Sequence, residues 1–297
     1  MERPGQGEAL VVWALWGAVA LTVLVTYSRV DPDELYHVSH EGLAGGLSRA
    51  AVLINFPIAL VAVATALVAV SVLPARAWLA AGPAIACAAV VPFVVDQDDL
   101  DVRPANAIPV LGVVLALSLT IAATRRAGVE LAPRRPGDPV RIVAALVVVL
   151  VSLPWITAEL GFHFPGDLFM GEEVLREADG TLLAAVHLGH HHGTDGTLLV
   201  LTALLLSRVR VPQRQLRLVL TGYLALMLSY GTVNMVQDLW QEQVVKRGWT
   251  DARIPSALVP GPDPIWAVVL ALAVLAALVL VREVRAEASV RPSYSAP

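Results

Sequence analysis

Long apolar runs separated by short polar connections recur along the whole chain. They cover residues 9–27, 50–73, 78–95, 107–124, 142–160, 197–207, 218–236 and 265–281. Most of them approach the roughly 20 residues that an α-helix needs to cross a hydrocarbon core about 30 Å thick. The pattern therefore predicts an all-α, polytopic membrane protein with about eight transmembrane helices.

The composition supports lipid as the main solvent of this chain. Hydrophobic residues make up 57% of it and charged residues only 15%, with a mean hydropathy of +0.68, whereas charged residues make up about 25% of a soluble domain. We expect residues 1–286 to form a single multi-pass domain and residues 287–297 to form a short disordered tail. The single cysteine, Cys87, excludes an internal disulfide and argues against a cysteine-based metal site.

The charged residues are distributed unevenly among the polar connections between the apolar runs. Most of the 21 lysines and arginines lie in residues 124–141 and 208–217 and near the two termini. Because basic residues concentrate on the cytoplasmic side, both termini are expected in the cytoplasm. Most of the 25 acidic residues and all seven histidines then fall on the opposite face. We therefore expect a site that faces the extracytoplasmic side of the plasma membrane. The scattered arginines form no patch that would bind nucleic acid.

The stretch HLGHHHGTDG, from His187 to Gly196, holds the densest group of histidines. The apolar run that follows, 197–207, measures about 16 Å as a helix, which is too short to cross the core. We expect this helix to extend backward to about Leu182 or Ala184, which would bring the stretch into the outer half of the membrane. Its glycines could instead break it into a half-helix and a re-entrant piece.

The spacing of these histidines is typical of a metal site. On a helix, His187, His191 and Asp195 lie at i, i+4 and i+8 on one face, with His190 beside them. Imidazole binds zinc, copper and iron, and an i, i+4 pair can chelate one ion. Asp195 would be a further ligand or would orient an imidazole N–H. The alternatives are histidines solvated in the headgroup region and a proton or ion path.

The pattern HxxHH formed by His187, His190 and His191 resembles one of the histidine boxes of membrane fatty-acid desaturases and hydroxylases. Those enzymes carry several such boxes and hold them on the cytoplasmic face, whereas this chain has one, on the opposite side. The resemblance covers five residues and implies a chemistry in common without membership of the family.

Two further groups are candidates for the same site. His37 and His40, at i, i+3, follow an acidic DPDE and could complete the metal site or lie on a surface loop. Glu159 and His163, at i, i+4, end the fifth apolar run as a carboxylate–imidazole pair. An acid raises the pKa of a neighbouring imidazole and can make it a general base. With Asp195, this pair makes up the predicted catalytic groups.

Ionisable side chains at membrane depth are costly and usually mark a functional site. Our leading hypothesis is a membrane enzyme that binds a transition metal and acts on a lipid or another membrane-associated small molecule. The alternative is a transporter or a proton or metal-ion conduit that uses the same histidines. A further alternative is a non-catalytic subunit or assembly factor, with other membrane subunits as its partners.

Overall fold

The fold was analysed in a computed structural model. The structure describes residues 6–30, 37–73, 78–88, 99–162, 165, 168–169, 174–176, 182–184, 192–257 and 263–290.

The described chain is predominantly helical. The first half contributes α1 (Gly7–Tyr27), α2 (Gly42–Leu53), the π-turn η2 (Ile54–Ile58), α3 (Ala59–Val70), α4 (Ala81–Ala88), the 3₁₀ turn η4 (Pro104–Asn106) and α5 (Ala107–Ala127). The second half contributes α6 (Asp138–Val151), α7 (Leu153–Glu159), β1 (Val174–Arg176), β2 (Leu182–Ala184), α8 (His192–Leu206), α9 (Arg214–Trp240), the π-turn η5 (Gln241–Val245) and α10 (Ile265–Val290).

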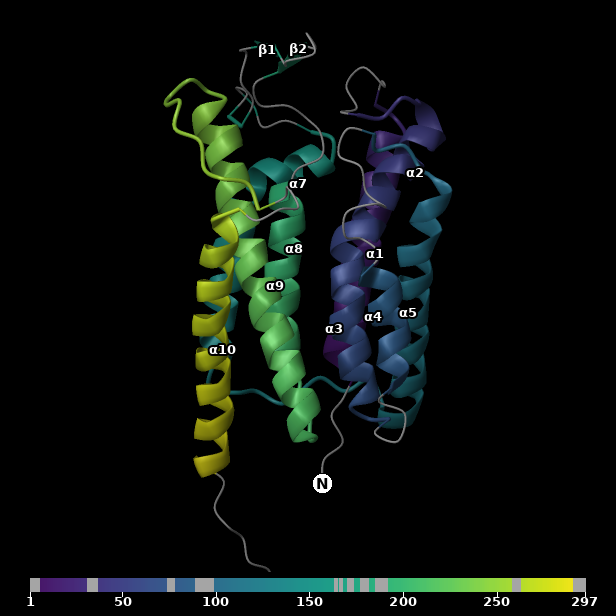
Figure 1. The fold of residues 1–297 in the computed structure, drawn as a ribbon, viewed down its shortest axis with the longest axis vertical. Helices are drawn as coiled ribbons and strands as arrows, with labels where there is room; N and C mark the ends of the chain where they lie inside the picture. Colours follow the sequence, from purple (N-terminus) through teal and green to yellow (C-terminus); the bar gives the residue numbers. More distant parts are fainter. Residues whose placement is uncertain are drawn as a thin grey trace, which may run out of the picture.

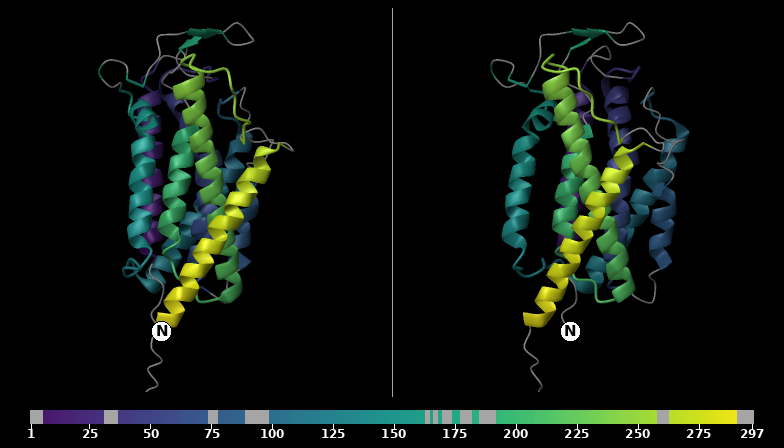
Figure 2. Two further views of the ribbon diagram at one scale, coloured as in Figure 1. Left: turned by 90° about the vertical axis from the view of Figure 1, so that its left-hand side faces the viewer. Right: turned by 60° about the vertical axis from the view of Figure 1, so that its left-hand side comes forward.

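The helices run along one long axis and define two ends of the molecule (Figure 1). The hairpin end, at the top of the view, carries β1, β2, α7 and the start of α2. At the opposite end, which we call the terminal end, α1 begins and α10 finishes. Helices α1–α5 stand on one side and α7–α10 on the other, and α1 and α3 contact α8 and α9 between them. Figure 2 shows α10 crossing the outside of its group at an angle.

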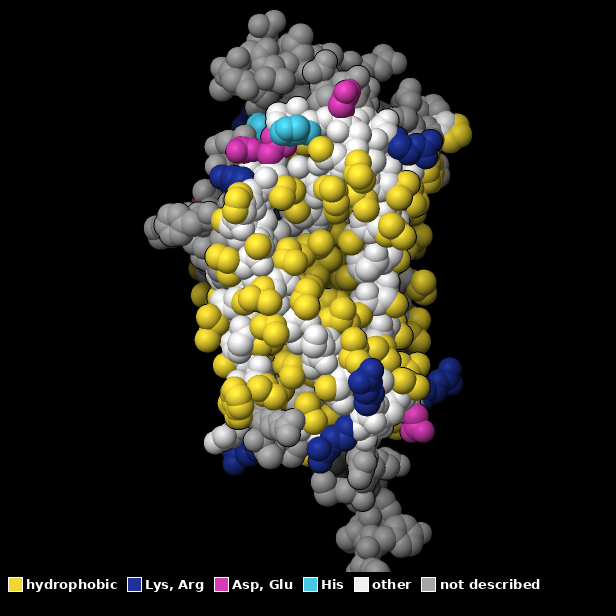
Figure 3. Space-filling view, turned by 90° about the vertical axis from the view of Figure 1, so that its right-hand side faces the viewer, with side chains coloured by type: hydrophobic (Ala, Val, Ile, Leu, Met, Phe, Trp, Pro, Cys, Tyr) yellow, Lys and Arg dark blue, Asp and Glu magenta, His cyan; other side chains and the backbone are white. Residues whose placement is uncertain are grey.

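The length and composition of the helices fit a membrane protein. Among the described residues, five helical segments are long and apolar enough to cross a bilayer (α1, α2–α3, α5, α9 and α10), and α6 with α7 makes a sixth if the bent pair counts as one span. Large hydrophobic side chains are exposed along α5, α6 and α10. Figure 3 shows such side chains over the middle of one face and charged ones near its two ends. The helical, apolar character is thus confirmed, while eight crossings remain a prediction.

Two of the predicted spans, the third and the backward-extended sixth, fall partly outside the residues that the structure describes. In the run 78–95 the structure describes a helical segment over Trp78–Ala88, and in the sixth run it describes His192–Leu206. Helix α10 continues to Val290, past the predicted start of the disordered tail at residue 287.

The fifth run is bent instead of straight. Between α6 and α7 the axis turns by 62°, and Pro154 lies in the first turn of α7. Proline lacks the N–H that a continuous helix would use, and its ring clashes with the carbonyl four residues earlier, so the helix bends there. The hydroxyl of Ser152 forms a hydrogen bond with Thr197 of α8 at the bend. As a result α7 turns across the hairpin end.

The predicted backward extension of the sixth helix is wrong. Residues Leu182–Ala184 form β2, which pairs antiparallel with β1 in the register Val174↔Ala184. Their backbone groups are therefore bonded across a hairpin and not along a helix. The described part of α8 begins at His192.

Close glycine packing holds α8 against α9. A Cβ atom on Gly231 would lie 2.7 Å from the carbonyl oxygen of Gly196, and one on Gly196 would lie 2.5 Å from that of Gly231. Small residues let helix backbones approach in this way, and they are favoured in membrane helix pairs. The pair Gly196–Gly231 therefore fixes the distance between the two helices at the level of the hairpin end.

We expect Gly231→Ala to destabilise the protein. The added methyl group meets backbone, which cannot turn aside, so the helices must separate at an overpacking cost of about 1–3 kcal/mol. Gly222→Ala is the matched control, because it lies in the same helix and a Cβ there meets nothing within 4 Å. Thermal unfolding in detergent should show a lower Tm for Gly231→Ala and an unchanged or slightly higher Tm for Gly222→Ala. Equal melting temperatures would contradict the packing.

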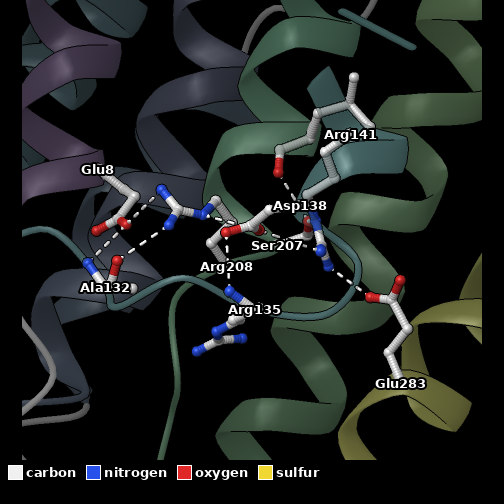
Figure 4. A network of polar contacts seen from close by, with 9 residues as sticks. Glu8, Ala132, Arg135, Asp138, Arg141, Ser207, Arg208 and Glu283 are labelled. Carbon is white, nitrogen blue, oxygen red and sulfur yellow. Dashed lines mark hydrogen bonds and ion pairs between the residues drawn. The ribbon is translucent and has the colours of Figure 1, made fainter. Parts of the chain in front are cut away.

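An ion-pair network ties the helices together at the terminal end (Figure 4). Arg208, just after α8, lies 3.4 Å from Glu8 of α1 and 3.1 Å from Asp138 of α6. It also donates to the carbonyl of Ala132 at 3.0 Å. Arg141 of α6 pairs with Asp138 and with Glu283 of α10. The network thus joins α1, α6, α8 and α10, which lie far apart in the sequence.

Candidate functional site

A second group of buried polar side chains lies at the hairpin end, between the two groups of helices. We call it the polar cluster, and its members are Tyr27, Arg49, Glu159, Thr194, Asp195 and Asp238. All except Asp238 are less than a tenth exposed, and Asp238 is partly buried. The cluster draws on α1 and α2 on one side and on α7, α8 and α9 on the other. It is therefore where the two groups of helices meet through polar contacts at this end.

Arg49 and Tyr27 supply the contribution of the first group. Tyr27 ends α1, and the guanidinium of Arg49 on α2 lies 5.5 Å from the centre of its ring. This is the geometry of a cation–π contact, which stabilises a desolvated guanidinium. Both side chains are buried, at 2% and 3% exposure.

Glu159 brings a carboxyl group to the same point from the second group. It is the last residue of α7, so the bend at Ser152 and Pro154 sets its position. The hydroxyls of Tyr27 and Thr194 lie beside its carboxyl group, and Arg49 is close enough to interact with it electrostatically. A buried carboxylate is tolerated in an apolar bundle when a cation and hydrogen-bond donors surround it in this way.

The first turn of α8 supplies Asp195 and links the cluster to α9. The backbone N–H of Gly193 donates to Oδ2 of Asp238 at 2.8 Å, which gives this helix start an acceptor for one of its free N–H groups. A Cβ atom on Gly193 would lie 2.2 Å from the ring of Trp155, so α7 packs directly on this turn. Asp195 lies within electrostatic range of both Glu159 and Asp238.

Two carboxyl groups, those of Glu159 and Asp195, therefore share one buried arginine, and a third, that of Asp238, lies near Asp195. In a region of low dielectric, carboxyl groups this close interact strongly and exchange protons as a set. Tyr27, Thr194 and the partly exposed His192, which lies near Arg49, add further groups that donate or accept hydrogen bonds. The arrangement is suited to acid–base chemistry or to the binding of a proton or cation.

His37 and His40 lie beside a different acidic segment. Nδ1 of His40 is 3.3 Å from Oδ1 of Asp101, and the His40 side chain is 63% exposed. The carbonyl of His37 accepts a hydrogen bond from the N–H of Leu100 at 3.0 Å. Partial burial alone would raise the pKa of Asp101, but hydrogen bonds from Ser39 and His40 outweigh it and hold the pKa below its ordinary value. The two histidines thus help to fix a loop contact at the hairpin end.

The predicted site residues divide into three sets. Glu159 and Asp195, predicted as catalytic, come together in the polar cluster. His37 and His40, predicted as metal ligands, lie at the contact with Asp101. The remaining histidines lie outside the residues that the structure describes: His163, His187, His190 and His191. Within the described ranges, no group of three or more histidine, cysteine, aspartate or glutamate side chains is arranged to hold a metal ion.

Sequence reasoning missed the positive partner of the carboxyl groups. Arg49 stands at the start of an apolar run, as an arginine anchored in the headgroups would. Tyr27 ends another run, where interfacial tyrosines are common. At neither position does the local sequence distinguish a buried side chain from one at the membrane interface. Asp238 lies just past the seventh apolar run, and its spacing of four from Asn234 and Glu242 marks a polar helix face that could have identified it.

Comparison with known proteins gives no further guide to function. No family model matches the chain, and no curated protein or solved structure matches it either.

Proposed function

We propose that this chain is a membrane enzyme whose site is the polar cluster, and that it acts on a lipid or another membrane-associated small molecule. The observation that carries the proposal is the meeting of Glu159, Asp195 and Arg49 in a buried position between the two groups of helices. Ionisable side chains are costly at such positions and are usually retained for function.

Within this proposal Glu159 and Asp195 are the general acid and base. Each carboxyl group is close to the other, so a proton lost by one can be held by its neighbour. Arg49 would stabilise negative charge that develops on a substrate, since its guanidinium is buried and permanently charged.

The proposed cofactor is a transition metal, zinc, copper or iron, held by His187, His190 and His191. These residues immediately precede α8, whose first turn carries Asp195. Imidazole nitrogen suits these metals, and a bound ion would supply a Lewis acid next to the carboxyl groups. His163 follows Glu159 by four residues and is a further candidate for the same place.

The proposed orientation has the hairpin end outside the cell. At the terminal end the arginines include Arg125, Arg126, Arg134, Arg135, Arg141, Arg208, Arg210, Arg214 and Arg217. Basic residues favour the cytoplasmic side, so the polar cluster would open to the extracytoplasmic side of the plasma membrane.

A transporter or ion conduit is the second candidate function. The observation in its favour is that the cluster joins two groups of helices, a position from which relative motion of the groups could open and close a binding site. Flux of protons or metal ions into proteoliposomes, abolished by Glu159→Gln, would favour this candidate over the enzyme.

The enzyme proposal is tested by metal content and lipid turnover together. Purified wild type is expected to hold a transition metal in stoichiometric amount, and a chelator should lower its Tm, because an ion bound only by the folded state stabilises it. In liposomes made from a total membrane lipid extract, mass spectrometry should reveal a lipid that wild type alters.

The variants separate the two parts of the proposal. His187→Ala/His191→Ala should lack the metal and show no chelator shift, while Glu159→Gln should keep the metal and lose turnover. A wild type without metal would exclude the cofactor. Turnover that is unchanged by Glu159→Gln would exclude the acid–base role of the cluster.

A further inference from the structure

One face of α9 and η5 is polar over its last turns. Residues with polar side chains recur there at every fourth position: Tyr230, Asn234, Asp238, Glu242 and Lys246. At 1.5 Å per residue this face runs for roughly 24 Å, from the hairpin end into the bundle. Its inner limit is Tyr230, whose ring stacks on Trp266 of α10 with 5.7 Å between the ring centres.

The face leads into the polar cluster. At its outer end, Nζ of Lys246 lies 2.8 Å from Oε1 of Glu242. Glu242 and Lys246 are close enough to Asp238 to interact with it electrostatically. Asp195 lies within the same range of Asp238 and of Tyr230. Ionisable groups therefore follow one another from the partly exposed Lys246 to the buried acids of the cluster.

Several atoms on this route are buried without a hydrogen-bond partner among the described residues. They are both amide atoms of Asn234, which is 0% exposed, Oε2 of Glu242 and Oε2 of Glu159. The hydroxyl of Tyr230 lies near the Asn234 amide and can satisfy at most one of its two polar atoms. A buried polar atom left unsatisfied costs about 1–3 kcal/mol. In proteins, such atoms are normally satisfied by ordered water that bridges several of them.

We infer that this face of α9 lines a water-filled path by which water and protons reach the polar cluster from the hairpin end. The path deepens the proposed function, on which its purpose rests, because acid–base chemistry at Glu159 and Asp195 needs exchange with bulk water. The hydration itself depends only on Asn234, Asp238 and Glu242, none of which we place in the metal site.

Cysteine labelling in lipid nanodiscs tests the path. In a Cys87→Ala background, Asn234→Cys is exposed to a small, charged methanethiosulfonate, which reacts with the thiolate and so requires water at the thiol. Val236→Cys is the matched control, because it lies two residues away on the outer face, where Val236 is 54% exposed to the apolar surroundings. We expect Asn234→Cys to be modified at least about tenfold faster than Val236→Cys. Equal rates, or faster labelling at position 236, would overturn the path.

Two additional variants keep the test decisive. If Asn234→Cys does not fold, Asp238→Cys takes its place, with the same control and the same expected ratio. Adding Glu242→Leu to the labelled variant should slow the modification, because an apolar side chain then replaces a polar one near the outer end of the path and disfavours water there. Labelling needs neither metal nor substrate. Failure to label would therefore contradict the path but not the proposed enzyme. A protein that labels as expected but lacks metal or turnover would contradict the proposed enzyme but not the path.

Discussion

Arg49→Met is expected to destabilise the protein by about 3–5 kcal/mol, since removing the one positive charge beside buried acids leaves them without compensation. The guanidinium of Arg49 is the positive group that interacts with both Glu159 and Asp195. Methionine has a similar length but carries no charge and donates no hydrogen bond. Thermal unfolding in detergent, followed by size-exclusion chromatography of the soluble fraction, measures the loss.

The control for this substitution is Arg29→Met. Arg29 follows α1 at the same end and is exposed, so its replacement removes the same charge without burying an unpaired acid. The double variant Arg49→Met/Glu159→Gln should regain part of the lost stability, because the neutral amide no longer needs the cation. An Arg49→Met protein as stable as Arg29→Met would mean that the cluster is held together by other contacts.

Arg208→Ala is expected to produce a loss of similar size at the opposite end, again of about 3–5 kcal/mol. Arg208 contacts Glu8, which is fully buried, and Asp138, which is 8% exposed. Without the arginine, both carboxylates keep their burial. Among the described residues Glu8 then has no ion-pair partner, and Asp138 keeps Arg141 and the backbone N–H of Arg135. Because the network joins α1, α6 and α10, we expect the unfolding transition to shift as a whole.

Arg214→Ala is the matched control for Arg208. It lies near the same end, is exposed and removes one basic residue from the same connection, so any effect on membrane orientation is shared. Arg208→Lys retains the charge but not the three-way geometry of a guanidinium and should show an intermediate Tm. Identical melting temperatures for Arg208→Ala and Arg214→Ala would contradict the role of the network.

Hydropathy was sufficient to locate the long helices. The runs 9–27 and 107–124 differ from α1 and α5 by no more than a few residues. Here composition decides the structure, because a backbone in hydrocarbon must satisfy its own hydrogen bonds. The bend in the fifth run could also have been predicted, since Pro154 stands inside an otherwise helical pattern.

The error before α8 arose from reading the apolar residues of LLAAV as helix. The dipeptide Asp179–Gly180 lies between VLR and LLA, and Asp-Gly between apolar segments is a strong hairpin signal. The prediction instead used these residues to lengthen a short span. Because β2 pairs with β1, residues 182–184 cannot lengthen α8 as helix.

The candidate site was predicted only in part for a physical reason. Glu159 and Asp195 stand out because carboxyl groups at the edges of apolar runs are costly. The burial of Arg49 depends on the packing of α2 against α1 and on the approach of Glu159 at the end of α7, which hydropathy does not encode. Long-range neighbours of this kind have no signature in a single sequence.

The close packing of α8 on α9 has a consequence for how the protein is made. The 15 described residues of α8 are mostly buried by neighbouring helices, α9 above all. A helix that exposes so little of its surface to lipid gains little by entering the membrane alone. We expect it to enter together with α9, the helix that covers it, and the close contact of Gly196 with Gly231 lets the two enter as a hairpin. During synthesis, α8 and α9 would then insert into the membrane together, as one pair of helices.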